Sequence, residues 1–135
     1  MDIENPRTVA ETYFRAWKER DFTTLREILA DDVGFQGPLA TLDNADDCVK
    51  GLEGMAQILD DIVVHHVFVD GPDVLTWFDL HTTVAPPAPT ASWLPIEDGK
   101  IMRIRVTFDR RALTGGRRMR WPGAASPDGS EDRRS

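Results

Sequence analysis

The chain has 135 residues, a length typical of one domain, and 41% of them are hydrophobic, which is enough to form a buried core. Its formal net charge of -7 disfavours nucleic acid or an anionic membrane surface as a partner. Cys48 is the only cysteine, so no intrachain disulfide can form. With no signal-like leader and no apolar run long enough to cross a bilayer, the sequence favours a cytoplasmic protein.

The first half of the chain predicts three helices. Asn5 can cap a helix that starts at Pro6, and apolar residues then recur at helical spacing to about residue 20. Asp21 can cap a second helix, which we expect to end within residues 30–32. The acidic segment 40–48 is expected to form a loop or a helix cap before the third helix. The apolar positions of the three helices are, in order, Val9, Tyr13, Ala16 and Trp17; Phe22, Leu25, Ile28 and Leu29; and Leu52, Met55, Ile58 and Leu59.

The second half of the chain predicts strands, because the apolar period changes from helical to two at residue 62. An Asp-Gly pair at 98–99 is a strong hairpin signal, whereas the proline-rich segment 85–90 is not expected to pair as a central strand. Helices followed by antiparallel strands predict an α+β domain over residues 1–113, and the polar segment 114–135 is predicted to be a disordered tail. The expected strands lie at 33–39, 62–69, 74–84, 91–96 and 101–108.

Three segments of this pattern resemble the NTF2-like superfamily, and within it the SnoaL-like group. Residues 12–38 resemble the opening helices and first strand, 51–59 the third helix, and 97–109 the closing hairpin and last strand. The resemblance implies a cone-shaped barrel in which three N-terminal helices pack on a strongly curved, mostly antiparallel sheet around a deep apolar pocket. It also implies a homodimer. The functions it implies are cofactor-independent acid–base enzymes, among them isomerases, cyclases, dehydratases and hydrolases, or binding modules without catalysis.

The catalytic residues of the family carry over only in part. The tyrosine that ketosteroid isomerases use as an oxyanion donor falls on Tyr13. Their aspartate base falls on Gly37 and their second carboxylic acid on Ala91, so the standard isomerase set is missing. The aspartate of limonene-epoxide hydrolases falls on Val106, so the resemblance does not predict that activity either.

Segment 76–82 places an acid and a histidine two residues apart within an apolar strand. Asp79 and His81 share one strand face with Trp77, roughly 7 Å apart along the strand, and the resemblance places this set on the pocket side. We therefore hypothesise that His81 transfers a proton, that Asp79 orients it and that Tyr13 donates a hydrogen bond to a substrate oxygen. The alternative is that Asp79 and His81 only satisfy each other or backbone groups.

The sequence leaves two functions open. The first is a SnoaL-like protein that binds a small apolar molecule in the deep pocket, with or without acid–base catalysis on it; the second is a non-catalytic ligand-binding or dimerisation module. Convergence of Tyr13, Asp79 and His81 would favour the enzyme, and a packed interior would favour the module. No cofactor is expected, and three histidines without ligand spacing predict no metal site; His65 and His66 should face opposite sides of their strand. The side chains expected to shape the pocket walls are Trp17, Met55, Trp77, Trp93 and Phe108.

Overall fold

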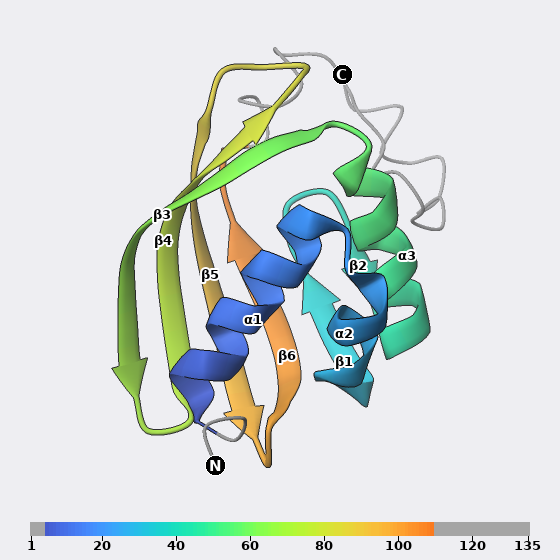
Figure 1. The fold of residues 1–135 in the computed structure, drawn as a ribbon, viewed down its shortest axis with the longest axis vertical. Coiled ribbons are helices and arrows are strands. Elements are labelled where there is room, and N and C mark those ends of the chain that lie inside the picture. The colour runs from blue at the N-terminus through green and yellow to red at the C-terminus, as the bar shows by residue number, and fades with distance from the viewer. Residues whose placement is uncertain (1–4, 110–135) are drawn as a thin grey trace.

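The computed structural model describes residues 5–109, which form three helices packed on one face of a six-stranded sheet (Figure 1). This arrangement confirms the predicted α+β class. The predicted tail at 114–135 and the predicted domain end at residue 113 lie outside the described residues. The elements in chain order are α1 (Pro6–Glu19), α2 (Phe22–Glu27), β1 (Leu29–Gln36), β2 (Thr41–Leu42), α3 (Ala45–Ala56), β3 (Leu59–Asp70), β4 (Asp73–Thr82), β5 (Ala88–Glu97) and β6 (Lys100–Thr107).

The sheet is mostly antiparallel and runs in the order β2-β1-β6-β5-β4-β3, with β1 and β6 as its parallel pair. The predicted hairpin between β5 and β6 is confirmed, because Asp98 and Gly99 both have the positive φ angles that a tight turn between twisted strands requires. Register shifts interrupt the pairing of β3 with β4 and of β5 with β6, and such bulges bend a sheet. The sheet therefore curves around α1, which crosses its concave face (Figure 1).

The helix starts follow from capping residues that the sequence displays. The Asn5 side chain accepts a hydrogen bond from Arg7 N at 2.9 Å, and α1 ends at Arg20, which adopts a left-handed conformation. The Asp21 side chain caps α2 by accepting from Thr24 N at 3.2 Å. These caps confirm the predicted starts of the first two helices.

Two helix ends differ from the prediction: α2 ends early, and α3 ends at Ala56, so that Leu59, predicted on the helix, already begins β3. The second helix ends at Glu27 rather than within 30–32, because Leu29 already begins β1. The acidic segment 40–48 provides the helix cap, which was one of its two expected forms: Asn44 caps α3, and the acidic residues of the first turn, Asp46 and Asp47, are favoured there by the helix dipole.

Strand β5 also differs from the prediction, because it begins inside the proline-rich segment. Pro89 pairs with Asp79 of β4, while β6 pairs with β5 only from Ala91 onward. Within the described chain, β5 therefore has one neighbour at Pro89, and a strand edge tolerates a residue without an N–H group.

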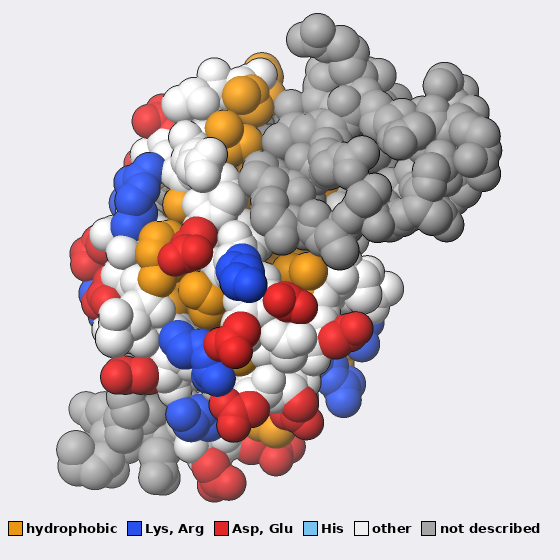
Figure 2. Space-filling model, turned by 90° about the vertical axis from the view of Figure 1, so that its right-hand side faces the viewer, with side chains coloured by type: hydrophobic (Ala, Val, Ile, Leu, Met, Phe, Trp, Pro, Cys, Tyr) orange, Lys and Arg blue, Asp and Glu red, His pale blue; other side chains and the backbone are white. Residues whose placement is uncertain are grey.

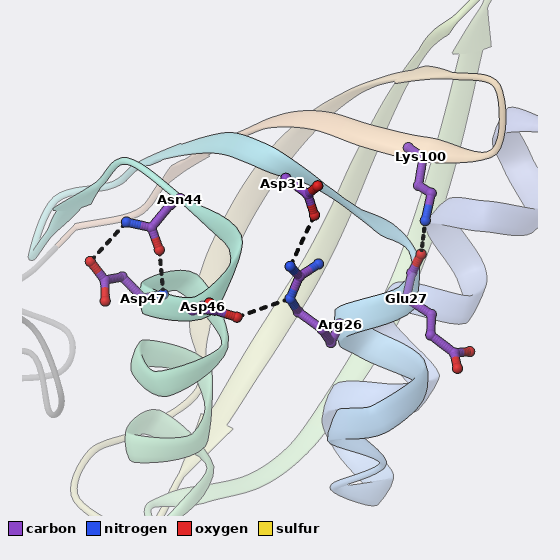
Figure 3. A network of polar contacts seen from close by, with 7 residues as sticks. All are labelled: Arg26, Glu27, Asp31, Asn44, Asp46, Asp47 and Lys100. Carbon is purple, nitrogen blue, oxygen red and sulfur yellow. Dashed lines mark hydrogen bonds and ion pairs between the residues drawn. The ribbon is translucent and has the colours of Figure 1, made fainter.

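An exposed polar network holds α2 against its neighbours (Figure 3). Arg26 donates to Asp31 of β1 at 2.9 Å and to Asp46 of α3 at 3.0 Å, and Lys100 of β6 donates to the Glu27 carbonyl. Acidic and basic side chains intermingle over this helical side of the molecule (Figure 2). Because exposed ion pairs contribute little each, the network orients the helices more than it stabilises them.

Candidate functional site

On strand β4, the side chains that face the helices are the uncharged ones, and the aspartate and the histidine face the other way. Thr76, Phe78 and Leu80 are buried, whereas Trp77 is 42% exposed and Asp79 and His81 are half-buried on the opposite face. The predicted placement of Trp77, Asp79 and His81 on the pocket side is therefore wrong. The physical reason is that burying the aromatic and aliphatic set removes apolar surface from water, while burying a carboxylate and an imidazole would cost their hydration.

The interior between the helices and the sheet holds a small central cavity of about 20 Å³. That volume accommodates about one water molecule. Tyr13, Trp17 and Phe108 line it, as expected for pocket residues, while Met55 is fully buried in the core outside its lining. The lining also includes Phe14, Phe35, Leu52, Phe78, Leu80, Thr90, Ser92, Ile104 and Val106.

The side chains around this cavity are uncharged, as in a hydrophobic core. Burial raises the pKa of Tyr13 well above its usual value, with a smaller contribution from the charge of Cys48, so the phenol is neutral at physiological pH. The Tyr13 ring packs edge-on against Phe14, with 4.9 Å between ring centroids. None of the described residues that line the cavity is a carboxylate or a histidine, so none of them can act as a general base beside Tyr13.

The position of the isomerase base is closed to a side chain. A Cβ atom on Gly37 would lie 2.7 Å from Val106 Cγ1, closer than two carbon atoms can approach without movement. An aspartate therefore does not fit there in this packing. Val106, where the epoxide-hydrolase resemblance would require an aspartate, lines the same apolar cavity.

Asp79 has a partner on the outer face, and it is not His81. His65 Nε2 lies 3.0 Å from Asp79 Oδ2. A bulge between Val64 and His66 allows this contact, since His66 pairs with Trp77 on the same outer face. The prediction that His65 and His66 face opposite sides is therefore wrong: the extra residue of the bulge breaks the strand alternation.

His81 pairs across the strands with Asp61, whose carboxylate is 2.7 Å from Lys18 Nζ. The hydrogen bond from Lys18 is the main cause that lowers the pKa of Asp61, and the charge of His81 adds a smaller effect. Tyr13 lies on the other side of the sheet, in the central cavity. The structure thus does not bring Tyr13, Asp79 and His81 to one point.

The outer face of the sheet carries an exposed apolar cluster that we call the outer patch: Phe68, Leu75, Trp77 and Trp93. Phe68, Leu75 and Trp77 are 58%, 43% and 42% exposed. Register places Leu75 between Phe68 on β3 and Trp93 on β5, so the side chains are neighbours on one surface. Trp77 and Trp93 were predicted to shape the pocket walls; they lie on this outer face, and Trp93 Nε1 donates to Asp73 at 3.0 Å.

Within residues 5–109, no three His, Cys, Asp or Glu side chains gather as a metal ion would require. None of the described helices combines the length and the apolar composition needed to cross a membrane.

Sequence reasoning missed most of the cavity lining because it chose the wrong alternate set of β4. Phe78 and Leu80 belong to the uncharged set of segment 76–82, and that lack of charge was the available signal. Phe14 was missed because it adjoins Tyr13 on α1 and was not counted on the buried face, although only 6% of it is exposed.

Comparisons with known proteins agree with this fold. The SnoaL-like domain model matches residues 10–105. A crystal structure from Kribbella flavida is 34% identical, with a TM-score of 0.71, and the match covers 76% of this chain and 84% of that one. An NTF2-like protein of unknown function from Cytophaga hutchinsonii is 23% identical over 81% of this chain and 94% of its own, with a TM-score of 0.74.

The structure of an LEH-like epoxide hydrolase from M. tuberculosis is 21% identical over 82% of this chain and 87% of its own, with a TM-score of 0.70. At that identity the likeness concerns the fold alone. A search of curated proteins finds no match.

Proposed function

The chain belongs to the SnoaL-like domain family, and we propose that within this family it is a non-catalytic module that pairs with a second copy of itself through the outer face of its sheet. The observation that supports the proposal most strongly is the outer patch. Large apolar side chains that adjoin one another on a solvent-facing surface are typical of protein–protein contact sites.

The charges around the outer patch suit a second copy. Arg103 and Arg105 are exposed on β6 at one side of the patch, and neither has an ion pair within the described chain. Asp79 and the exposed Asp70 lie on the opposite side, on β4 and β3. A two-fold axis that passes through the patch parallel to the strands would set the basic side of each copy against the acidic side of the other, as a self-complementary interface requires.

The shape of this face supports the same arrangement. A shallow hollow of about 720 Å³ adjoins the patch, with Leu75, Trp93 and Arg105 among its lining residues. Trp77 projects from the neighbouring part of the face. A protruding aromatic ring on one copy and a hollow on the other are the elements from which interface hot spots are built.

The enzyme hypothesis receives less support from the described geometry. A cavity of about 20 Å³ is far below the roughly 300–1,000 Å³ of pockets that hold small organic substrates. Tyr13 and the Asp79–His65 pair lie on opposite sides of the sheet, so a single substrate could not contact both. Asp79 and His65 satisfy each other's hydrogen bonds, whereas the alternative from the sequence had paired Asp79 with His81 or with backbone groups.

Sedimentation equilibrium of the full chain tests the proposal. The wild type is expected to sediment as a dimer, and Leu75→Arg, which places a charge in the centre of the patch, should sediment as a monomer. Val84→Arg is the matched control: Val84 is an exposed aliphatic residue outside the patch, 53% exposed, and its variant should stay dimeric. A wild type that remains monomeric at every soluble concentration would overturn the proposal, as would equal dissociation of both variants.

A further inference from the structure

A second hollow of the molecule lies between α1 and the β3–β4 hairpin, beside the central cavity and distinct from it. We call it the helix–hairpin groove; its volume is about 370 Å³. Figure 1 shows α1 crossing the sheet with this hairpin beside it. Phe14 lines both spaces and so forms the wall between the groove and the central cavity. The lining residues are Ala10, Glu11, Phe14, Arg15, Lys18, Glu19, Ile62, Val64, Val67 and Thr76.

Thr76 lines the groove, and its hydroxyl oxygen is buried beneath the groove surface without a hydrogen-bond partner among the described residues. The residue is only 1% exposed. Around it the groove is lined by Phe14, Ile62 and Val67, which are apolar. Buried hydroxyl groups in native proteins are almost always paired, so an unpaired one that lines an apolar hollow calls for a functional reason.

The rim of the groove offers no unpaired charge to an ionic ligand. Glu11 is paired with Arg7 at 3.2 Å, Arg15 with Glu19 at 3.0 Å, and Lys18 with Asp61 at 2.7 Å. Each charge at the rim therefore already has a counter-charge within the protein. An ionic head group would have to compete with these pairs, whereas a neutral molecule would leave them intact.

We propose that the helix–hairpin groove is a binding site for a small neutral molecule with an apolar body and one hydroxyl or carbonyl group, which hydrogen-bonds to Thr76 Oγ1 after the Thr76 side chain rotates and brings that oxygen into the groove. A threonine hydroxyl both donates and accepts, so either group can pair with it. The volume lies at the lower end of the range of ligand pockets, which fits a ligand of one or two rings. The proposal does not depend on self-association, because the groove and the outer patch lie on opposite faces of the sheet.

Equilibrium dialysis of the full chain against three related probes tests the site. The probes are 2-naphthol, naphthalene, which lacks the hydroxyl, and 2-naphthalenesulfonate, which adds a charge. The wild type should bind 2-naphthol about fivefold more tightly than naphthalene, the effect of one net hydrogen bond, and the sulfonate most weakly. Thr76→Val should abolish the preference for 2-naphthol over naphthalene, and Thr76→Ser, which keeps the hydroxyl, should retain it.

Two neighbouring valines on β3 provide the spatial control. Val64 lines the groove and is 44% exposed, so Val64→Trp should fill the groove and abolish binding of both uncharged probes. Val63 is 36% exposed on the opposite face, paired with Asp79, and Val63→Trp should bind like the wild type. Neither valine lines the central cavity, so binding there would not respond to Val64→Trp.

Three results would overturn the proposal. They are a wild type that binds none of the probes, a Val64→Trp variant that binds as the wild type does, and a Thr76→Val variant that keeps the full preference for 2-naphthol. Circular dichroism and melting curves of each variant confirm that it is folded. Thr76→Val should melt no lower than the wild type, because it removes an unpaired hydroxyl and keeps the side-chain shape.

Discussion

Leu80 and His81 are adjacent on β4 but face opposite sides of the sheet, and this contrast gives the sharpest test of the described interior. Leu80 is 3% exposed and lines the central cavity, whereas His81 is half-buried on the outer face. Leu80→Ala removes buried methyl groups in a packed core and should lower the free energy of unfolding by about 2–5 kcal/mol. His81→Ala should change it by about 0.5 kcal/mol or less, as substitutions on a protein surface do.

Urea unfolding followed by fluorescence measures the change in the free energy of unfolding for both variants by one method. A total stability of about 5–15 kcal/mol is usual for one domain, so Leu80→Ala should remain folded in water while its midpoint falls clearly. Equal slopes of the unfolding free energy against urea concentration would show that the two variants expose the same surface area on unfolding. If His81→Ala cost more than Leu80→Ala, the assignment of the two faces of β4 would be reversed, and the acid and histidine would line the interior after all.

Three further predictions concern single side chains. Trp17→Phe should lower the free energy of unfolding by about 1–3 kcal/mol in urea titrations, because it removes the buried hydrogen bond of 2.9 Å from Trp17 Nε1 to the Leu52 carbonyl and replaces a buried indole with a smaller ring. Burial raises the pKa of the Cys48 thiol to about 12, so iodoacetamide at pH 8 should alkylate it only in denaturant, and rapid alkylation of the native protein would contradict this. The free energy of unfolding should also fall as the pH rises from about 9 toward 12, because the folded state holds the thiol proton more tightly than the unfolded state does. Hydrogen bonds from Thr24 lower the pKa of Asp21, so the contribution of Asp21 to stability is present above about pH 4 and is lost as the pH falls through the lower folded-state pKa. In melting curves, Asp21→Asn should therefore lose less stability than the wild type between about pH 4 and pH 2. An acid dependence equal to that of the wild type would refute the assignment.

The fold was predictable because its signals are local. The cap at Asn5 and the turn at Asp98 and Gly99 each depend on neighbouring residues, and both are confirmed by the structure. The change of apolar period at residue 62 correctly indicated a strand, but the strand begins earlier, at Leu59. The form of segment 40–48 stayed open because two local signals compete there. Asp46 and Asp47 read equally well as an acidic loop and as the first turn of a helix, and only the Asn44 cap decides between them.

The site was less predictable because strand alternation alone does not say which face is inside. Segment 76–82 contains two alternate sets of residues, and the set with Asp79 and His81 was predicted to face the pocket because those two side chains can carry out acid–base chemistry. The cost of burying those groups points to the other set, which the structure confirms. The bulge that brings His65 to Asp79, and the approach of Val106 to Gly37, depend on contacts between distant segments that no local pattern reveals.

Self-association through the outer face is the central claim, and intermolecular paramagnetic broadening in NMR tests it most directly. Unlabelled protein carrying a spin label at Glu97→Cys, an exposed position of β5, is mixed with isotope-labelled wild type; the buried Cys48 should not react with the label. A label at Glu53→Cys, exposed on α3, serves as the matched control. The account predicts that the Glu97→Cys label broadens amides of β4 and β5 in the partner copy and that the Glu53→Cys label broadens none. Broadening confined to the helices, or none from either label, would contradict it.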